Sequence, residues 1–335
     1  MNKRRAAFTI AALAVLLATA AGWWVTVEYQ RDMRRAREHA YAGSELALTR
    51  CGPIEYASSG NGPPVLIVHG AGGGFDQGMG FAQPLVEQGF RVIAMSRFGY
   101  LRTSLPADAS AEAQADAHAC LMDALQIDRA AVIGASAGAP SSMQFALRHP
   151  ERCAALVLLV PAVYAPRAAN APSMHTPAGT AFLFDTALRS DFLYWAATRV
   201  ARRTLVRALL ATPPEVVDKA QLQEQARVAA TIDSVLPISP RRLGLVNDAR
   251  VTSSLPRYEL ERIAAPTLLI SVADDLFGTY DGARYSAQHI PGARFIGYAT
   301  GGHVWVGHQN DVTSQIASFV RSPFDAAAND QALKP

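Results

Sequence analysis

Short apolar runs alternate with longer amphipathic stretches through most of the chain after residue 51. The apolar runs lie at residues 65–68, 91–95, 130–133 and 153–160. Stretches of helical composition follow the first three runs, at residues 76–89, 108–126 and from the third run to about residue 149. This alternation predicts an α/β domain with a mostly parallel sheet and crossover helices.

The alternation stops between residues 163 and 255 and resumes afterwards. Within that interval the helical stretches are residues 183–199, 205–210 and 216–230. Strand-like runs return at 266–270 and 293–298, followed by a terminal helix near 311–320. The pattern therefore predicts a mostly helical insertion into the α/β domain. Residues 323–335 are expected to form a disordered tail.

The amino terminus carries an apolar run of a different kind, without any charged residue from 6 to 27. A helix of that length rises about 33 Å, which is enough to cross the hydrocarbon core of a bilayer. Trp23 and Trp24 lie near its end, where aromatic rings favour the membrane interface. We expect residues 1–27 to be a transmembrane anchor. The alternatives are a secretory signal cleaved after Ala18-Thr19-Ala20 and a buried helix of the domain.

Basic residues flank this run on both sides, so the charge rule for membrane orientation does not decide between the two directions. They are Lys3, Arg4 and Arg5 before it, and Arg31, Arg34, Arg35 and Arg37 after it. A short leader before a long carboxyl-terminal domain favours a domain outside the cytoplasm. Residues 28–50 are polar and are expected to form a linker.

Composition narrows the class of protein. The 335 residues are 50% hydrophobic, which is enough for one large core and an accessory subdomain. The net charge is +3, from 31 basic and 28 acidic side chains. Nucleic acid is therefore excluded as the main partner, because phosphate binding needs a concentrated basic face.

Three cysteines are too few and too scattered for a disulfide scaffold or a metal cluster. Cys153 precedes an apolar run and is expected to be a buried thiol. Cys51 and Cys120 can pair if the fold brings their Cα atoms within roughly 7 Å. The sequence leaves that pairing open.

One strand-to-helix turn has the residues of a nucleophile elbow. Gly134-x-Ser136-x-Gly138 follows the apolar run at 130–133 and precedes a helix. The two glycines are needed because side chains at those positions would collide with neighbouring backbone. The strained turn exposes the serine hydroxyl at the amino-terminal end of the helix. The structural alternative is a tight turn without chemistry.

A serine nucleophile needs a base and a group that orients the base. His303 follows the last strand-like run and is the expected base, with His308 as the competitor. The acid should follow the strand at 266–270, where Asp274 and Asp275 are adjacent. We choose Asp275. An aspartate after a strand is also common as a capping or turn residue.

The oxyanion of the reaction needs backbone N–H donors. The amide of Ala137, directly after the nucleophile, is one candidate. The loop after His69-Gly70 should supply the second, at Ala71 or Gly72. That loop lacks the Gly-Lys-Ser/Thr of a phosphate-binding loop and the spacing of a dinucleotide fingerprint.

Together these motifs resemble the α/β-hydrolase superfamily, over about residues 51–320. They are the His69-Gly70 turn, the Gly99 turn, the elbow at Ser136, Asp275 and His303. The resemblance is to the branch with a helical cap after the sixth strand. It implies an eight-stranded, doubly wound, mostly parallel sheet, with the core at 51–162 and 256–322 and the cap at 163–255.

The resemblance leaves the substrate open. The branch includes carboxylesterases, lipases, haloperoxidase-like enzymes, epoxide hydrolases, dehalogenases and hydrolases of carbon–carbon bonds. Ser136 argues against epoxide hydrolases and dehalogenases, which use aspartate at the elbow. Ser96 departs from the family pattern, which often has aspartate there. Ala137 and Gly138-Ala139 also depart, from a bulky residue and a second glycine.

The expected activity is hydrolysis of a small carboxylic ester through an acyl-enzyme, without a metal or organic cofactor. Carbon–carbon bond hydrolysis of a dienoate diketone is the first alternative. It needs a cation from the cap, for which Arg189, Arg199 and Arg202 are candidates. The second alternative is a membrane-tethered binding protein without catalysis.

The cap is expected to cover the pocket. Aromatic candidates for lining the pocket, or for packing the cap on the core, are Phe182, Phe184, Phe192, Tyr194 and Trp195.

Overall fold

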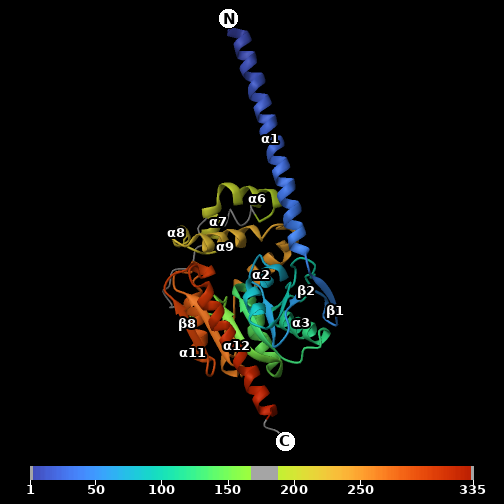
Figure 1. The fold of residues 1–335 in the computed structure, drawn as a ribbon, viewed down its shortest axis with the longest axis vertical. Coiled ribbons are helices and arrows are strands. Elements are labelled where there is room, and N and C mark those ends of the chain that lie inside the picture. The colour runs from blue at the N-terminus through green and yellow to red at the C-terminus, as the bar shows by residue number, and fades with distance from the viewer. Residues whose placement is uncertain (1–2, 167–187, 333–335) are drawn as a thin grey trace.

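A mixed β-sheet with helices on both faces forms the centre of the molecule in a computed structural model (Figure 1). The structure describes residues 3–166 and 188–332. Eight strands lie in the order β1-β2-β4-β3-β5-β6-β7-β8. β1 and β2 pair antiparallel, as do β2 and β4, and the other neighbours are parallel. The predicted eight-stranded, mostly parallel α/β fold is confirmed.

The strands are short and central ones are buried along their length. They are β1 (Glu45–Thr49), β2 (Gly52–Ser59), β3 (Pro64–Val68), β4 (Arg91–Met95), β5 (Ala130–Ala135), β6 (Cys153–Leu159), β7 (Thr267–Val272) and β8 (Arg294–Tyr298). Every residue of β6 and β7 is buried. Such continuously apolar runs are typical of strands covered on both faces.

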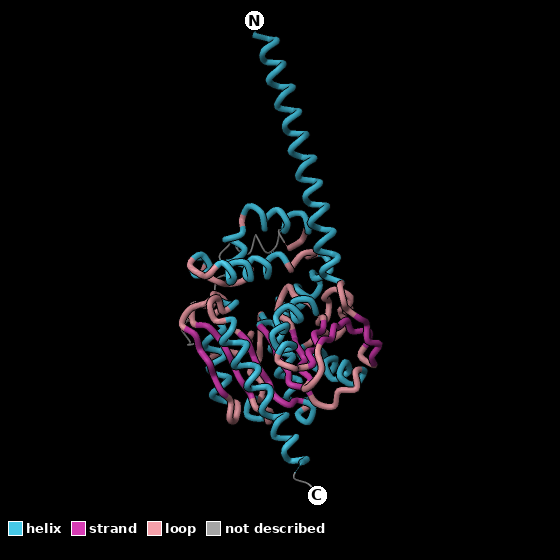
Figure 2. The backbone as a smooth tube through the Cα atoms, in the orientation of Figure 1, coloured by secondary structure: helices cyan, strands magenta, loops and turns pink. Residues whose placement is uncertain are grey.

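Helices cover the two faces of the sheet (Figure 2). They are α2 (Phe75–Glu87) and α12 (Gln309–Ala332) on one face, and α3 (Ala111–Ala124), α4 (Ala139–Arg148) and α11 (Thr279–His289) on the other. Each face has its own apolar core. Alternate residues of one strand enter different cores: Leu66 and Val68 join one, Val65 and Ile67 the other.

A helical cap lies between β6 and β7 in the chain, and its described part is residues 188–255. Its helices are α6 (Asp191–Val200), α7 (Arg202–Ala208), α8 (Pro214–Asp218), α9 (Leu222–Asp233) and α10 (Arg242–Thr252), with the 3₁₀ turn η3 (Ser239–Arg241) before α10. Over this described part all regular elements are helical, as the interrupted strand pattern predicts. The expected helix at 216–230 is split at residues 219–221.

The amino-terminal helix α1 (Lys3–Tyr41) is longer than the expected anchor. Within the described residues it contains the one helix long and apolar enough to cross a membrane, by length and composition. The expected linker at 28–50 is different in the structure. Its first part continues α1, and its last part forms β1, which pairs with β2. β1 has only partly buried and exposed residues, and its apolar run is only three residues long, Leu46 to Leu48, which is too short to predict a strand.

The carboxyl terminus also differs from expectation. α12 runs through Pro323 to Ala332, where a disordered tail was expected. Its first half buries Val312, Ile316 and Val320 against the sheet. Alanine-rich sequence after residue 324 then continues the helix with favourable intrinsic propensity.

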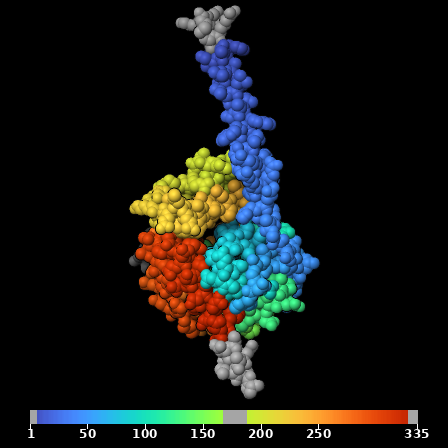
Figure 3. All heavy atoms as spheres, in the orientation of Figure 1, coloured from blue at the N-terminus to red at the C-terminus, as the bar shows by residue number. Residues whose placement is uncertain are grey.

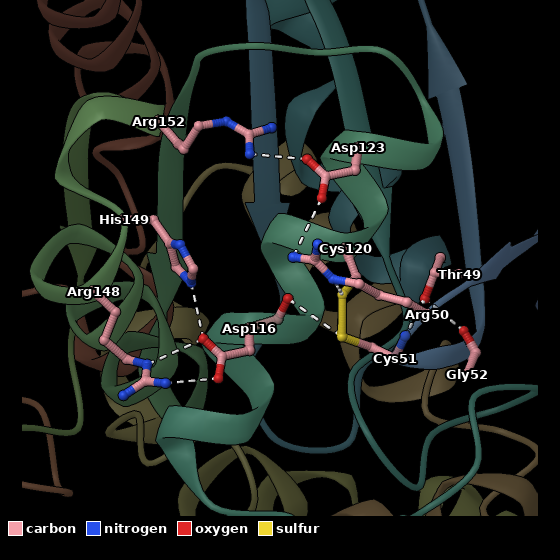
Figure 4. The surroundings of a disulfide bond; sticks show 10 residues. All are labelled: Thr49, Arg50, Cys51, Gly52, Asp116, Cys120, Asp123, Arg148, His149 and Arg152. Atoms are coloured by element: carbon pink, nitrogen blue, oxygen red, sulfur yellow. Dashed lines mark hydrogen bonds and ion pairs between the residues drawn. A yellow bond between two sulfur atoms is a disulfide. The ribbon is translucent and has the colours of Figure 1, made fainter.

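A disulfide joins Cys51, in the turn between β1 and β2, to Cys120 of α3 (Figure 4). Their Cα atoms are 6.1 Å apart, within the range that a disulfide spans. The pairing that the sequence leaves open is therefore present. Cys153 is a free, buried thiol, as expected.

Candidate active site

Ser136 occupies a sharp turn between β5 and α4, at the carboxyl edge of the parallel strands. Its φ is 48°, in the left-handed region that non-glycine residues rarely adopt. A Cβ on Gly138 would lie 2.5 Å from the Val68 carbonyl oxygen, and one on Gly134 would lie 3.2 Å from the Ala139 Cα. The neighbours of Gly138 are backbone, so that position accepts only glycine. At Gly134 a Cβ would also lie 2.7 Å from the Ser142 Cβ, so a side chain there would displace Ser142 of α4.

His303 lies between Ser136 and Asp275. Its Nε2 is 2.9 Å from the Ser136 Oγ, and its Nδ1 is 2.8 Å from Oδ2 of Asp275. The carboxylate can only accept, so Nδ1 carries the proton in this arrangement and Nε2 accepts from the serine hydroxyl. The structure thus brings together three residues that lie far apart in the sequence.

The Asp275 carboxylate is buried, with 5% of the residue exposed. Burial alone would raise its pKa, but the neighbouring His303 and its hydrogen bonds hold the pKa of Asp275 below its usual value. The Phe277 amide donates to Oδ1 at 2.9 Å, and the Thr279 hydroxyl donates to Oδ2. The carboxylate is therefore fixed and ionised beside the imidazole.

The competing residues lie elsewhere. Asp274 Oδ1 accepts from the Gly302 amide at 2.7 Å, so it holds the turn before His303. His308 is half-buried, stacks on Tyr298 with ring centroids 4.1 Å apart, and contacts the Thr300 carbonyl oxygen. Neither side chain contacts Ser136 or the His303 ring in the described structure.

The loop after β3 lies directly beside the nucleophile. A Cβ on Gly70 would be 3.3 Å from Cβ of Ser136. Ala71 is exposed next to it, whereas the Gly72 amide donates to the Tyr100 hydroxyl at 3.2 Å. Of the two loop amides considered, Gly72 is thus already engaged, which leaves Ala71 as the candidate oxyanion donor.

Ala137 is the first residue after the nucleophile and is buried. It belongs to the 3₁₀ turn η1 (Ser136–Gly138), which leads into α4. The first N–H groups of such a helix have no acceptor within the helix and point towards its amino-terminal end. The Ala137 amide is therefore a candidate oxyanion donor.

His69 holds the backbone of the loop, and its hydrogen bonds go to Gly70 and Arg97 rather than to the triad residues. Its Nδ1 lies 2.7 Å from the Gly70 carbonyl oxygen, and its Nε2 accepts from the Arg97 amide at 2.9 Å. Burial and the nearby Arg97 charge hold the pKa of His69 well below its usual value. The neutral ring is thus held by hydrogen bonds on both nitrogens and fixes the position of the Gly70 backbone.

A buried ion pair links this loop to the cap. Arg97, in the turn after β4, donates to both oxygens of Asp248 on α10 at 2.7 Å. The same guanidinium donates to the carbonyl oxygens of His69 and Gly70, at 2.8 and 3.2 Å. Tyr100 donates from its hydroxyl to Asp248 as well. One cap carboxylate therefore orders the groups that hold the loop.

A second buried pair reaches the far end of the loop. Arg241 of η3 is fully buried and donates to Oδ2 of Asp76 and to the Gly73 carbonyl oxygen, both at 2.6 Å. Backbone contacts reinforce the junction, since the Leu101 amide donates to the Pro240 carbonyl oxygen at 2.8 Å. Sequence reasoning missed both ion pairs, because the partners are 151 and 165 positions apart.

The cap side chains proposed for the pocket lie mostly elsewhere. Tyr194 and Trp195 are buried within the cap, and Phe192 is half-exposed beside α1. Phe182 and Phe184 lie outside the described residues. Among the arginines, Arg199 pairs with Asp32, Arg202 pairs with Asp233, and Arg189 is exposed. The named aromatic residues of the described cap thus serve packing.

Ser96, where the family often has aspartate, has a structural explanation. Its hydroxyl donates to buried Glu55 at 2.8 Å and accepts from the Phe75 amide at 3.1 Å. Glu55 also accepts from Arg102. The negative charge of the expected aspartate is supplied here by Glu55 on β2.

Over residues 3–166 and 188–332, no group of three or more histidine, cysteine, aspartate or glutamate side chains is arranged to hold a metal ion.

The sheet order, the cap after β6 and the serine turn after β5 define the class of α/β-hydrolase proteins. A family profile described as alpha/beta hydrolase fold matches residues 63–306, which is most of the chain. The chain belongs to this family. Its relatives include hydrolases, and we describe the protein as a hydrolase.

Individual relatives are similar at moderate identity. An uncharacterized hydrolase of Bacillus subtilis, YcgS, is 28% identical over 79% of this chain and 93% of its own length. A 2-hydroxy-6-oxononadienedioate/2-hydroxy-6-oxononatrienedioate hydrolase of Paraburkholderia xenovorans is 30% identical over 68% of this chain and 76% of its own. Among solved structures, an alpha/beta hydrolase fold protein from Nakamurella multipartita superposes with a TM-score of 0.68 at 29% identity, covering 83% of this chain and 99% of that one.

Proposed function

We propose that the protein hydrolyses carboxylic esters through an acyl-enzyme formed on Ser136. The observation that carries the proposal is the unbroken chain of contacts from the Ser136 hydroxyl through His303 to the buried Asp275 carboxylate. Such a chain activates a hydroxyl that is otherwise a weak nucleophile. The cap and the strained elbow are the setting in which this chemistry occurs in the family.

The mechanism follows from the roles of these atoms. Ser136 Oγ attacks the ester carbonyl carbon while His303 Nε2 takes the hydroxyl proton. Asp275 stabilises the imidazolium, and the amides of Ala137 and Ala71 donate to the oxyanion. His303 then protonates the leaving alcohol, which leaves an acyl group on Ser136. Water, deprotonated by His303, releases the carboxylic acid and restores the serine.

Carbon–carbon bond hydrolysis is the second candidate function, because the relative from Paraburkholderia xenovorans is named for that substrate class. A dienoate carboxylate needs a cation in the pocket. Two of the cap arginines considered for this task, Arg199 and Arg202, already bind carboxylates of this chain. Ester hydrolysis makes no such demand and is the better supported function.

The test uses the full chain in detergent or nanodiscs, with Ser136→Ala as the inactive variant and His308→Gln as a matched surface control. Short-chain aryl esters and ring-fission-type dienoate diketones are compared as substrates, and a fluorophosphonate probe reports the nucleophile. We expect aryl ester turnover and labelling that Ser136→Ala abolishes and His308→Gln retains. Turnover of the dienoate alone would support the second candidate. Folded wild-type protein without turnover or labelling would overturn both enzyme proposals.

We also infer that α1 anchors the protein in a membrane with the catalytic domain outside the cytoplasm. Length and hydropathy support an anchor, although a secretory signal has the same properties. The Cys51–Cys120 disulfide supports the orientation, since disulfides persist in oxidising compartments. Protease treatment of intact spheroplasts should digest the domain, and the membrane fraction should retain residues 3–27. Protection of the domain would reverse the orientation, and a mature chain starting after Ala20 would replace the anchor by a cleaved signal.

A further inference from the structure

The lower part of α1 is packed against the cap (Figure 3). Met33 of α1 is 2% exposed and belongs to the apolar core of the cap. Asp32 accepts from the Trp195 ring nitrogen at 2.9 Å, and Tyr29 lies edge-on to Trp195 with centroids 5.4 Å apart. α1 and the cap helix α6 are therefore held in one fixed arrangement.

α6 has a buried side and an apolar exposed side. Tyr194, on the buried side, donates from its hydroxyl to the Ile232 carbonyl oxygen of α9. Phe192, Leu193 and Val200 are 43%, 42% and 86% exposed. At about 100° per residue these three side chains fall on one side of the helix, away from Tyr194. We call Phe192, Leu193 and Val200 the outer face of α6.

α6 lies in the part of the cap on the side on which α1 leaves the domain (Figure 1), and its opposite, buried side contacts α9 through Tyr194. The exposed rings of Trp23 and Trp24 mark the end of the apolar run of α1. Tyr29, which contacts Phe192, follows Trp24 by five residues, or about 7.5 Å along a helix. The headgroup layer of a bilayer is about 5–8 Å thick on each side. Phe192, the member of the outer face that contacts Tyr29, thus lies close to the depth of that layer when α1 spans the membrane.

We propose that the outer face of α6 rests in the headgroup layer of the bilayer that α1 crosses. The proposal rests on the inferred anchor. Its particular support is that α1, the aromatic boundary and the apolar outer face are parts of one packed unit. An interfacial helix with apolar side chains on one side gains affinity by burying them among the lipids. The cap is then held on the membrane surface at two places, by α1 and by α6.

The test places an environment-sensitive fluorophore on single introduced cysteines of the full chain, in nanodiscs that hold one chain each. Leu193→Cys and Val200→Cys report the outer face. Leu16→Cys reports insertion of α1, and Leu48→Cys on β1 is an exposed control away from the cap. Cys153 is buried and Cys51 and Cys120 are paired, so the introduced thiol takes the label.

With lipids that carry a quencher near the headgroup, we expect quenching at positions 193 and 200 to exceed that at position 48 several-fold. A quencher deep in the acyl chains should quench position 16. Quenching at 16 without quenching at 193 and 200 would overturn the docking of the cap and leave the anchor intact. No quenching at 16 would overturn the anchor and the docking together. Quenching at 193 and 200 that appears only with two chains per disc would assign the outer face to a second copy and overturn the proposal.

Discussion

The two halves of the candidate site are held in place by different parts of the molecule. Ser136, His303 and Asp275 stand on turns that follow β5, β8 and β7, so the central sheet carries all three side chains. The cap contacts two of these turns through their backbone, since the Leu276 amide donates to the Ala211 carbonyl oxygen and Arg227 donates to the Val304 carbonyl oxygen. The loop that carries Ala71 depends on the cap, because Asp248 and Arg241 hold the groups around it.

The groups that carry out the reaction, Ser136 and His303, are thus supported differently from the loop whose Ala71 amide is the candidate oxyanion donor. Short turns at the edge of the sheet carry the nucleophile and the base, and the cap holds the turn around His303 through hydrogen bonds of Arg227 and Glu224 to its backbone, without a buried ion pair. The loop is rich in glycine and has few side chains of its own to pack, so buried charges from the cap order it. Substitutions in the triad should lower activity without unfolding the protein. Substitutions in the ion pairs that order the loop should lower stability as well as activity.

The largest effect is expected from Asp275→Asn, which damages the first half alone. The amide can offer its NH₂ to His303 and favour the wrong tautomer, and a related change in another serine triad lowers kcat by about 10⁴. Asp274→Asn is the matched control, since its amide oxygen can still accept from Gly302, and we expect a loss of about tenfold or less. Steady-state kinetics measures both. Equal losses would show that Asp275 has no special role.

Arg241→Met should affect stability most, because it leaves the buried Asp76 carboxylate without its partner. Removing one member of a buried pair typically costs about 3–5 kcal/mol. The double variant Arg241→Met/Asp76→Leu removes both charges and should recover most of that free energy of unfolding. Urea unfolding monitored by circular dichroism measures the series. A single variant as stable as wild type would show that this pair does not hold the loop.

Asp248→Asn should lower kcat by about 10- to 100-fold while KM changes little. The change loosens Arg97 and Tyr100, which hold the Gly70 and Gly72 backbone, and losing one oxyanion donor outright costs about 10²–10³. A boronate that mimics the tetrahedral intermediate should lose affinity by the same factor. Unchanged boronate affinity with a raised KM would instead assign Asp248 to substrate binding.

The smallest effect is a pH dependence of the free energy of unfolding. It comes from two buried histidines, His118 beside α4 and His69 beside the glycine-rich loop. Burial lowers the pKa of His118, which contacts Ser141 of α4, to about 3, and His69 under the loop is also lowered. Unfolding lets these rings bind protons near pH 6.5, so stability is present above that pH and is lost as pH falls towards 3. Each ring should contribute a slope of about 1.4 kcal/mol per pH unit.

His118→Gln should remove one such slope between pH 6.5 and 4.5, whatever its effect on stability at pH 7. Denaturant unfolding at a series of pH values measures it, with His308→Gln, at a half-buried histidine, as the control. An unchanged slope in His118→Gln would show that the buried ring does not control this dependence.

The same division explains what the sequence could predict. The sheet and the elbow are encoded locally, by apolar runs and by glycines that the turn requires, and the fold was predicted. The order of the two aspartates after β7 does not by itself decide which one faces His303, and in the structure Asp275 is the one that contacts the ring. The residues that order the loop come from pairs such as Arg97 and Asp248, which no local pattern relates.

Other differences have the same cause. β1 has only three consecutive apolar residues, Leu46 to Leu48, because its edge position leaves it largely exposed, and so short a run does not distinguish a strand from a linker. Tyr194 and Trp195 are candidates for the pocket on sequence alone, because the residue type does not tell whether an aromatic side chain lines a pocket or packs against another helix. Burial by a distant helix is decided by the tertiary structure, and the sequence shows only its apolar character.

Hydrolysis through an acyl-enzyme on Ser136 is tested most directly by rapid quenching of an aryl ester reaction, followed by peptide mapping of the acyl group. We expect a burst of phenol and an acyl adduct on the peptide containing Ser136, with both absent in Ser136→Ala. Ester turnover without an adduct, or with the acyl group on another residue, would contradict this mechanism.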